Sequence, residues 1–265
     1  MVPLLTPPEL ANTYDPQKHA TGAELLNEYR DAMAWLEEHP DTGPTKAAEE
    51  LDLPYGRIYN WMKGSKPDLV KTCDAASELD WFDASIQSPL GGAFINLVAA
   101  VLSGGTIAER DFAPSFIPEP EIEDDVISAI ETLGLSPRQI QREERVSEIR
   151  LESQHALLGR ALVALGCPTG PKNETASVDL PEYLTDATDS QRRDFVRIYI
   201  INRGSLHGDG LAIMEQRTTS YRRDLADLFR SVIDGTVTVT ERRIYLPQET
   251  VSGLYFEYPR NPQDT

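Results

Sequence analysis

A short segment, YGRIYNWMKGSK at positions 55–66, combines side chains that can recognise nucleic acid. The guanidinium of Arg57 and the carboxamide of Asn60 are suited to the edges of guanine and adenine in the major groove of DNA. Between positions 57 and 71, four basic residues stand against a single acid, Asp68. In an acidic chain, such a local positive patch indicates contact with a phosphate backbone. The candidate DNA-binding residues of this segment are Arg57, Tyr59, Asn60, Lys63 and Lys66.

Short helices are expected to carry these side chains. The spacing of apolar residues predicts an amphipathic helix over 21–38, with Thr21 as its cap. A short helix capped by Thr45 follows, then a turn at DLPYG and a second short helix over 55–63 that Gly64 ends. In this second helix we expect outward positions for Arg57, Tyr59 and Asn60, and inward positions for Ile58, Trp61 and Met62.

Two short helices joined by a tight turn resemble a helix-turn-helix. A further helix follows them, with Trp81 and Phe82 as core residues. Together these elements predict an N-terminal all-α helix-turn-helix domain over residues 1–86. A small three-helix bundle without any DNA role is the alternative.

The chain as a whole is strongly acidic, with 43 acids, 25 bases and a net charge of -18. Taken alone, this charge argues against a polyanionic partner, because phosphate contacts drive non-specific binding. The acids are spread along the whole chain and lysines are few, which resembles the composition of proteins from salt-loving archaea. In multimolar salt, charge repulsion is screened within about 3 Å. An acidic chain that binds proteins or mimics nucleic acid is the alternative.

Composition also limits the class of protein. No apolar stretch is long enough to predict a membrane span, and the N-terminus lacks the pattern of a secretory signal. Cys73 and Cys167 stand far apart, which disfavours a zinc site or a disulfide framework. The four histidines are scattered. We therefore expect a cytoplasmic protein that needs no cofactor.

The rest of the chain contains an internal repeat. NLVAAVLSGGTI at 96–107 and FVRIYIINRGSL at 195–206 each read as an apolar helix, a turn with glycine and a strand. In both halves, two strands, a helix and two further strands follow, and a closing helix is clear only in the first half. A linker rich in Pro, Gly, Thr and Asp separates the halves, which span about 94–166 and 190–265.

This arrangement resembles the LAGLIDADG homing endonucleases, in the form with two pseudo-symmetric halves in one chain. LVAAVLSGGTI resembles the motif helix and its exit, and LGCPTGPK followed by VDLPEYL resembles the loop between the halves. TTSYRRDLADLFRSV resembles the helix that follows a hairpin. The resemblance implies an α+β fold, a pseudo-two-fold αββαββ saddle over residues 87–265, which binds double-stranded DNA. In the family, the last acid of each motif helix binds the divalent metal that activates water.

At those two positions this sequence has no acid. The alignment places Gly104 at the first position and Arg203 at the second. Neither residue can bind a metal, so we expect no nuclease activity, no catalytic residue and no metal. Three acids follow the motif helices, and we expect all three to be solvated surface residues: Glu109, Asp111 and Asp209.

The resulting hypothesis is a non-catalytic, sequence-specific DNA-binding protein, and specifically a transcriptional regulator. Arg203 would place positive charge beneath the duplex. Five arginines of the second half could add contacts: Arg217, Arg222, Arg223, Arg242 and Arg243. The combination of parts is similar to that of the bacterial WhiA regulators, although there the helix-turn-helix follows the LAGLIDADG part. An active or recently decayed homing endonuclease and a protein-interaction scaffold are the alternatives. The sequence leaves open whether the N-terminal domain dimerises, and it predicts no contact with membranes.

Overall fold

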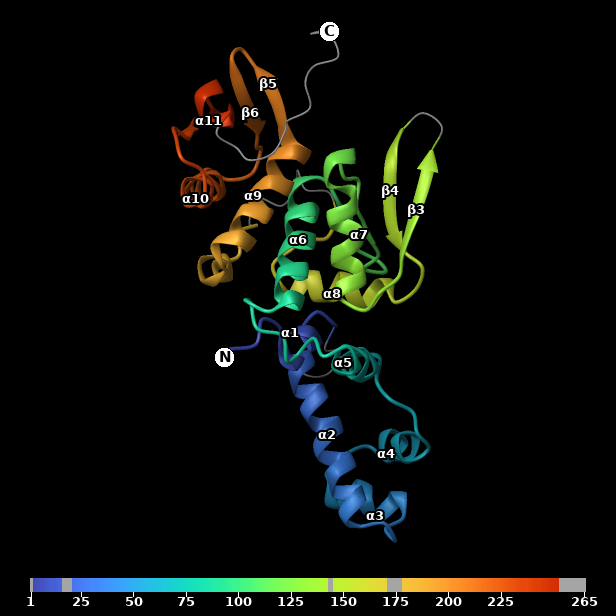
Figure 1. Ribbon diagram of the computed structural model, residues 1–265. Coiled ribbons are helices and arrows are strands. Elements are labelled where there is room, and N and C mark those ends of the chain that lie inside the picture. Colours follow the sequence, from blue (N-terminus) through green and yellow to red (C-terminus); the bar gives the residue numbers. More distant parts are fainter. Residues whose placement is uncertain (1, 16–20, 143–144, 171–177, 253–265) are drawn as a thin grey trace. The chain divides into compact units, whose positions relative to one another are not determined.

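The computed structural model describes residues 2–15, 21–142, 145–170 and 178–252 (Figure 1). The chain divides into two compact units. The N-terminal unit is Leu5–Phe82, and the C-terminal unit is Met1–Leu4 together with Asp83–Thr265. As predicted, the fold mixes helices and sheets.

The N-terminal unit consists of helices α1 (Pro7–Ala11), α2 (Gly22–Glu38), α3 (Pro44–Glu50), α4 (Tyr55–Met62) and α5 (Asp68–Glu78). The Thr21 side chain accepts a hydrogen bond from the Glu24 backbone amide, as the sequence predicts. Gly64 follows α4 with a φ of 87°, a conformation that glycine adopts at little cost. The core of this unit includes Leu10, Leu26, Ile58, Trp61 and Trp81.

Two predictions for this unit are wrong. Thr45 does not cap α3, because Gly43 is the N-cap residue and Pro44 occupies the first turn. Proline is well suited to that position, since its missing N–H would have no intrahelical partner. Met62 is 39% exposed and does not face the core, which Ile58 and Trp61 reach from the same helix.

The C-terminal unit contains the predicted repeat. Its first half runs α6 (Pro89–Ser103), β1 (Thr106–Ile107), β2 (Pro114–Ser115), α7 (Glu123–Thr132), β3 (Pro137–Arg142), β4 (Arg145–Leu151) and α8 (His155–Ala164). Its second half runs α9 (Asp189–Arg203), β5 (Gly204–His207), β6 (Gly210–Met214), α10 (Thr219–Arg230), β7 (Thr238–Val239), β8 (Arg243–Leu246) and α11 (Gln248–Ser252). The second half therefore also has a closing helix, α11, although it is short. Single 3₁₀ turns precede α7 and α9, at Pro120–Ile122 and Glu182–Asp186.

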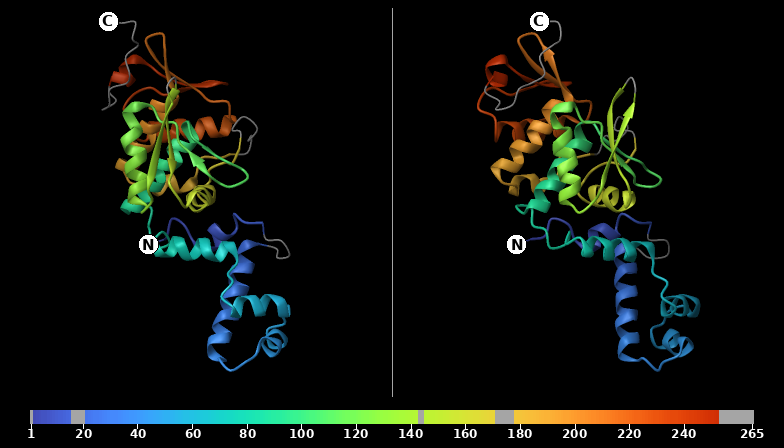
Figure 2. Two further views of the ribbon diagram at one scale, coloured as in Figure 1. Left: turned by 90° about the vertical axis from the view of Figure 1, so that its right-hand side faces the viewer. Right: turned by 45° about the vertical axis from the view of Figure 1, so that its right-hand side comes forward.

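The strands pair in the same antiparallel pattern in both halves. The second half forms one sheet in the order β5-β6-β8-β7. The first half forms two hairpins, β1-β2 and β3-β4, and a bridge between Phe116 and Ile149 joins them in the corresponding order. Figures 1 and 2 show the β3–β4 and β5–β6 hairpins extending at the same end of this unit.

Helices α6 and α9 pack against each other in the middle of this unit (Figure 1). Helix α6 is largely apolar and buried, whereas α9 is amphipathic and buries its apolar residues between Phe195 and Ile201. Ser88 caps α6 and Thr188 caps α9, each by accepting a backbone N–H bond with its side-chain oxygen. Within the described ranges, every helix is too short or too polar to cross a lipid bilayer.

Candidate nucleic-acid interface

The exposed surface of α4 is smaller and less basic than the sequence predicts. Tyr59, Asn60 and Lys63 are exposed, and the Lys63 ammonium lies 5.8 Å from the centre of the Tyr59 ring. Tyr59 also stacks on Tyr55, with ring centroids 5.8 Å apart. This helix therefore presents an amide, an ammonium and two phenol rings to solvent.

Arg57, in contrast, is bound within its own unit. Its guanidinium donates to the Glu28 carboxylate on α2 and lies 5.8 Å from the centre of the Trp61 ring. The side chain is 26% exposed. The prediction that Arg57 faces outward is thus only partly correct, because Glu28 holds it against α2.

The remaining lysines of the predicted patch also have acidic partners. Lys66 donates to Asp74 over 2.6 Å, and this hydrogen bond raises the pKa of the Lys66 ammonium. Lys71 donates to Asp68 over 2.9 Å. Asp74 and Glu28 lie outside the 57–71 window, so counting charges within that window overstates the positive patch.

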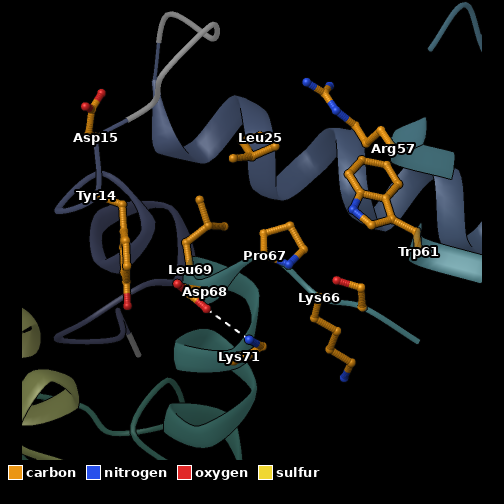
Figure 3. A pocket seen from close by; sticks show the side chains of 11 residues that line it. Tyr14, Asp15, Leu25, Arg57, Trp61, Lys66, Pro67, Asp68, Leu69 and Lys71 are labelled. Atoms are coloured by element: carbon orange, nitrogen blue, oxygen red, sulfur yellow. Dashed lines mark hydrogen bonds and ion pairs between the residues drawn. The ribbon is translucent and has the colours of Figure 1, made fainter. Parts of the chain in front are cut away.

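These side chains surround a pocket of about 510 Å³ between α2, α4 and α5. Figure 3 shows Arg57 beside Trp61 at one end of it, and the Lys71–Asp68 pair below Leu69. Acidic and basic groups both line the pocket, and the ion pairs keep most of the charges satisfied.

In the C-terminal unit, the ends of α6 and α9 meet through one hydrogen bond. The Asn202 side-chain amide donates to the Ser103 hydroxyl over 2.8 Å, and its carbonyl oxygen accepts from the backbone N–H of Glu119 at 3.1 Å. Ser103 in turn donates to the Ala99 carbonyl at 2.7 Å. Asn202 therefore ties the second half to two segments of the first half.

Gly104 and Arg203 follow this contact, one on each helix. Gly104 is the C-cap of α6, and a Cβ atom there would lie 3.3 Å from Asn202 Nδ2 and 3.4 Å from the Ile117 carbonyl oxygen. Arg203 is exposed, and its Nη2 donates to the Met214 carbonyl at 3.1 Å. Both residues line a pocket of about 250 Å³, together with Ser103, Thr106, Glu215, Gln216 and Arg217.

The strand register places Gly104 and Arg203 at equivalent positions in the repeat. Phe116 bridges Ile149 and Ile213 pairs with Ile244, which makes Phe116 and Ile213 equivalent. The preceding residues, Ser115 and Ala212, pair with Thr106 and Ser205. Thr106 lies two residues after Gly104, and Ser205 lies two residues after Arg203. Hydrogen bonding thus gives the same alignment of the halves as the sequence pattern does.

A buried network that sequence reasoning missed lies under this pocket. The Arg217 guanidinium donates from Nη1 to Glu215 Oε2 at 3.0 Å and to the Tyr199 hydroxyl at 3.1 Å, and from Nη2 to the Leu102 carbonyl at 2.8 Å. Tyr199 donates to Glu215 at 2.6 Å. Burial is the main cause that raises the pKa of Tyr199 well above its ordinary range. The only hint in the sequence is the spacing Glu-x-Arg directly after an apolar strand.

Two of the five arginines predicted as DNA contacts belong to this buried region. Arg217 is 7% exposed and Arg222 is 5% exposed, so neither can reach a duplex on the surface. Arg222 instead donates to the backbone carbonyls of Glu215 and Arg217. Arg223 and Arg242 are exposed, and Arg243 bonds to the ring of His207 at 2.7 Å.

The three acids near the motif helices do not gather around the helix ends. Glu109 and Asp111 are exposed in the β1–β2 connection, and Asp209 accepts a hydrogen bond from the Tyr245 hydroxyl at 2.9 Å. In the part of the chain that the structure describes, no three His, Cys, Asp or Glu residues are grouped so that they could hold a metal ion.

The strands differ in charge from the rest of the chain. The chain has 43 acids and 25 bases, yet Glu148 is the single acid in the eight described strands. The basic residues of these strands are all arginines: Arg138, Arg142, Arg145, Arg150 and Arg243. The sheets are therefore the basic elements of an acidic protein.

The solved structures that are similar in fold to this chain include the following three. The N-terminal LAGLIDADG domain of DUF199/WhiA is 15% identical, with a TM-score of 0.39 over 69% of this chain and 91% of that one. The homing endonuclease I-WcaI bound to its DNA recognition sequence is 10% identical, with a TM-score of 0.43 over 72% and 86%. I-DmoI in complex with DNA and Mn is 10% identical, with a TM-score of 0.37 over 59% and 89%. No family model and no curated protein sequence matches the chain.

Proposed function

We propose that this protein binds double-stranded DNA in a sequence-specific manner without cleaving it, and that it regulates transcription. The observation that carries the proposal is the arginine content of the strands, five arginines against one acid in a chain of net charge -18. Phosphate contacts by basic side chains supply most of the affinity of proteins for DNA.

The strand register supports this proposal by placing arginines on the open face of each sheet. Ile149 and Ile244 are fully buried, so the sheet face on which each lies is the covered face, and the opposite face is called the open face. Neighbouring residues in a strand point to opposite faces, which puts Arg150 and Arg243 on the open faces. Arg138 pairs directly with Arg150 and shares its face.

The pairing of Arg138 with Arg150 is itself unusual. Like charges directly opposite each other destabilise a pair of strands. Both side chains are exposed, and a phosphate between them would relieve the repulsion. This pair is therefore suited to bind the DNA backbone.

The single acid of the strands does not oppose such binding. Glu148 is 5% exposed, and its carboxylate accepts from the Ser115 hydroxyl at 2.5 Å and from Arg150 Nε at 2.6 Å. Its charge is therefore held within the sheet and orients Arg150, which remains half-exposed.

Base reading is assigned to α4 of the N-terminal unit. Asn60 is suited to a bidentate contact with adenine, and Lys63 to guanine or to a phosphate. Arg57 has a positioning role in this proposal, because its bonds to α2 fix the helix that carries Asn60.

The absence of cleavage is proposed from the residues at the helix ends. A metal-dependent nuclease needs carboxylate oxygens around its divalent ion. Gly104 has no side chain, and Arg203 brings a fixed positive charge to the equivalent position. The acidity of the remaining surface is proposed as an adaptation to high salt.

The experiment that tests the proposal is selection from random duplex DNA with the full chain, over a range of KCl concentrations and with Mg²⁺ present. We expect enrichment of one site with the duplex intact on a gel. Specific cutting would instead establish a homing endonuclease. No enrichment at any salt concentration would overturn DNA binding and favour the protein-interaction scaffold.

A variant set then tests the arginine surface. Arg138→Gln, Arg150→Gln and Arg243→Gln together should reduce the slope of log affinity against log salt by about three, because each lost phosphate contact lowers it by about one. Arg223→Gln is the matched control, since Arg223 is exposed on α10 and outside the strands. An equal effect of both variants would contradict the assignment.

A further inference from the structure

Two large apolar side chains are exposed on the open faces of the sheets. Ile117 is 46% exposed and Met214 is 50% exposed. Single exposed apolar side chains are common on protein surfaces, so the positions of these two residues in the repeat are more informative than their exposure.

The register shows that Ile117 and Met214 are equivalent residues of the repeat. Phe116 bridges Ile149 in the first half, and Ile213 pairs with Ile244 in the second, all four fully buried. Ile117 and Met214 are each the next residue along the chain, and so each points to the open face.

Both residues adjoin the ends of the paired helices. The Ile117 carbonyl oxygen lies 3.4 Å from the Cβ position of Gly104, and the Met214 carbonyl accepts from Arg203. The two halves join between them through the Asn202–Ser103 bond. One exposed apolar side chain therefore stands on each side of the junction.

We propose that Ile117 and Met214 are a pair of apolar wedges that enter the minor groove of bound DNA and bend the duplex. The inference rests on the proposed function. Isoleucine and methionine are among the side chains that part base steps in this way, and the resulting kink bends DNA toward the major groove. The strands that pair beside the two residues, β4 and β8, carry three arginines and one acid, which complements DNA better than an acidic protein surface.

The equivalence of the two residues also predicts where the bend lies. Contacts related by a two-fold arrangement fall symmetrically about the centre of a pseudo-palindromic site. The wedges therefore act at two base steps placed symmetrically about the centre of the selected sequence, and flexible pyrimidine–purine steps are favoured there.

The test measures DNA bending by fluorescence resonance energy transfer between dyes at the two ends of a selected duplex. The wild-type chain should shorten the distance between the dyes. Ile117→Ala with Met214→Ala should remove at least about half of that change, while the variant still binds when its concentration is raised. Thermal unfolding of the variant, which loses only exposed side chains, should match that of the wild type.

Leu206→Ala is the matched control. Leu206 is also 50% exposed, but it pairs with the buried Leu211 and so lies on the other face of its sheet. This variant should bend DNA as the wild type does.

Each remaining outcome overturns the wedge assignment. A wild-type complex with a straight duplex would refute it and leave DNA binding intact, whereas failure of the wild type to bind any duplex would refute both. Unchanged bending by the double variant, or equal loss in Leu206→Ala, would also refute it. Self-association of the wild type that only the double variant abolishes, with bending unchanged, would identify the pair as a contact between copies of the chain.

Discussion

The Asn202 side chain donates a 2.8 Å hydrogen bond to the Ser103 hydroxyl, and the two residues occupy equivalent positions in the two halves. In a two-fold arrangement, equivalent residues touch only where the axis passes between them. The contact therefore marks the point about which the halves are related. It also explains why Gly104 and Arg203 stand on either side of one small pocket.

Loss of this contact should weaken the junction of the halves. Asn202→Ala removes the donor to Ser103 and the acceptor for the Glu119 amide, so we expect a loss of about 2 kcal/mol in the free energy of unfolding. Unfolding by denaturant measures this free energy for the wild type and the variant. Asn60→Ala, at an exposed position, should cost far less. Equal stability of the two variants would show that Asn202 does not join the halves.

Arg217 is expected to be a far more sensitive position. Arg217→Met leaves the Glu215 carboxylate without its cationic partner at 1% exposure and removes the donor to the Leu102 carbonyl of α6. Breaking a buried pair in this way costs about 3–5 kcal/mol. Adding Glu215→Gln to this variant should recover part of the loss, because no unpaired charge then remains. If the double variant is less stable than Arg217→Met, the charge of Glu215 is not the cause.

The repeat and the course of most helices could be predicted from the sequence, because both depend on local periodicity and on glycine. The role of Arg217 and Arg222 could not. Arginine is a surface residue in most contexts, and these two become buried only because Glu215, Tyr199 and backbone carbonyls meet them in three dimensions. The partners of Arg57 and Lys66 were missed for the same reason, since Glu28 and Asp74 lie on other helices.

Stability should fall in strongly alkaline solution through the tyrosines of the C-terminal core. Burial is the main cause that raises the pKa of Tyr221 from 10.0 to about 12. Because the folded pKa is the higher one, the stabilisation is fully present below pH 10 and is lost as the pH rises toward 12. The free energy of unfolding should fall by about 1.4 kcal/mol per pH unit for this group.

Tyr221→Phe isolates that contribution. The phenylalanine does not titrate, so the stability of the variant should fall less steeply than that of the wild type between pH 10 and 12. Chemical unfolding followed at each pH gives both slopes. Burial also raises the pKa of the Cys73 thiol, to about 11, so its contribution is common to both proteins and cancels in the comparison. Identical slopes would show that Tyr221 ionises without unfolding the core.

The lysines near α4 should differ in their effect on DNA binding. Lys63 is exposed with its ammonium over the Tyr59 ring, whereas Lys66 is bound to Asp74. Lys63→Ala should therefore lower affinity for the selected site and reduce the salt slope by about one, and Lys66→Ala should change the slope less. Fluorescence anisotropy titrations over a range of KCl concentrations give both slopes. A larger effect of Lys66→Ala would mean that its ion pair opens on binding.

Asn60 should determine sequence preference rather than overall affinity. Loss of a bidentate contact with adenine costs about 1–3 kcal/mol at one base pair. The Asn60→Ala protein should therefore bind DNA sites that differ at that base pair with nearly equal affinity. The slope of log affinity against log salt should stay unchanged. Selection repeated with this variant should show one base pair of the site at which adenine is no longer preferred. A uniform loss across all positions would instead assign Asn60 to the backbone.

Carboxylates restored at the helix ends should create a metal site. Gly104→Asp with Arg203→Asp places two acids at equivalent positions beside the Ser103–Asn202 contact, and the φ of -144° at Gly104 is outside the left-handed region that favours glycine. The new Cβ lies 3.3 Å from Asn202 Nδ2, so the amide must shift by a few tenths of an ångström. We expect the double variant to bind Mn²⁺ in calorimetric titrations more tightly than the wild type does, because two carboxylates supply the oxygen ligands that such ions need. Arg203→Asn with Gly104→Asn is the control, since it fills the same space without charge. Equal Mn²⁺ binding by the aspartate and asparagine variants would show that these helix ends do not converge on one ion.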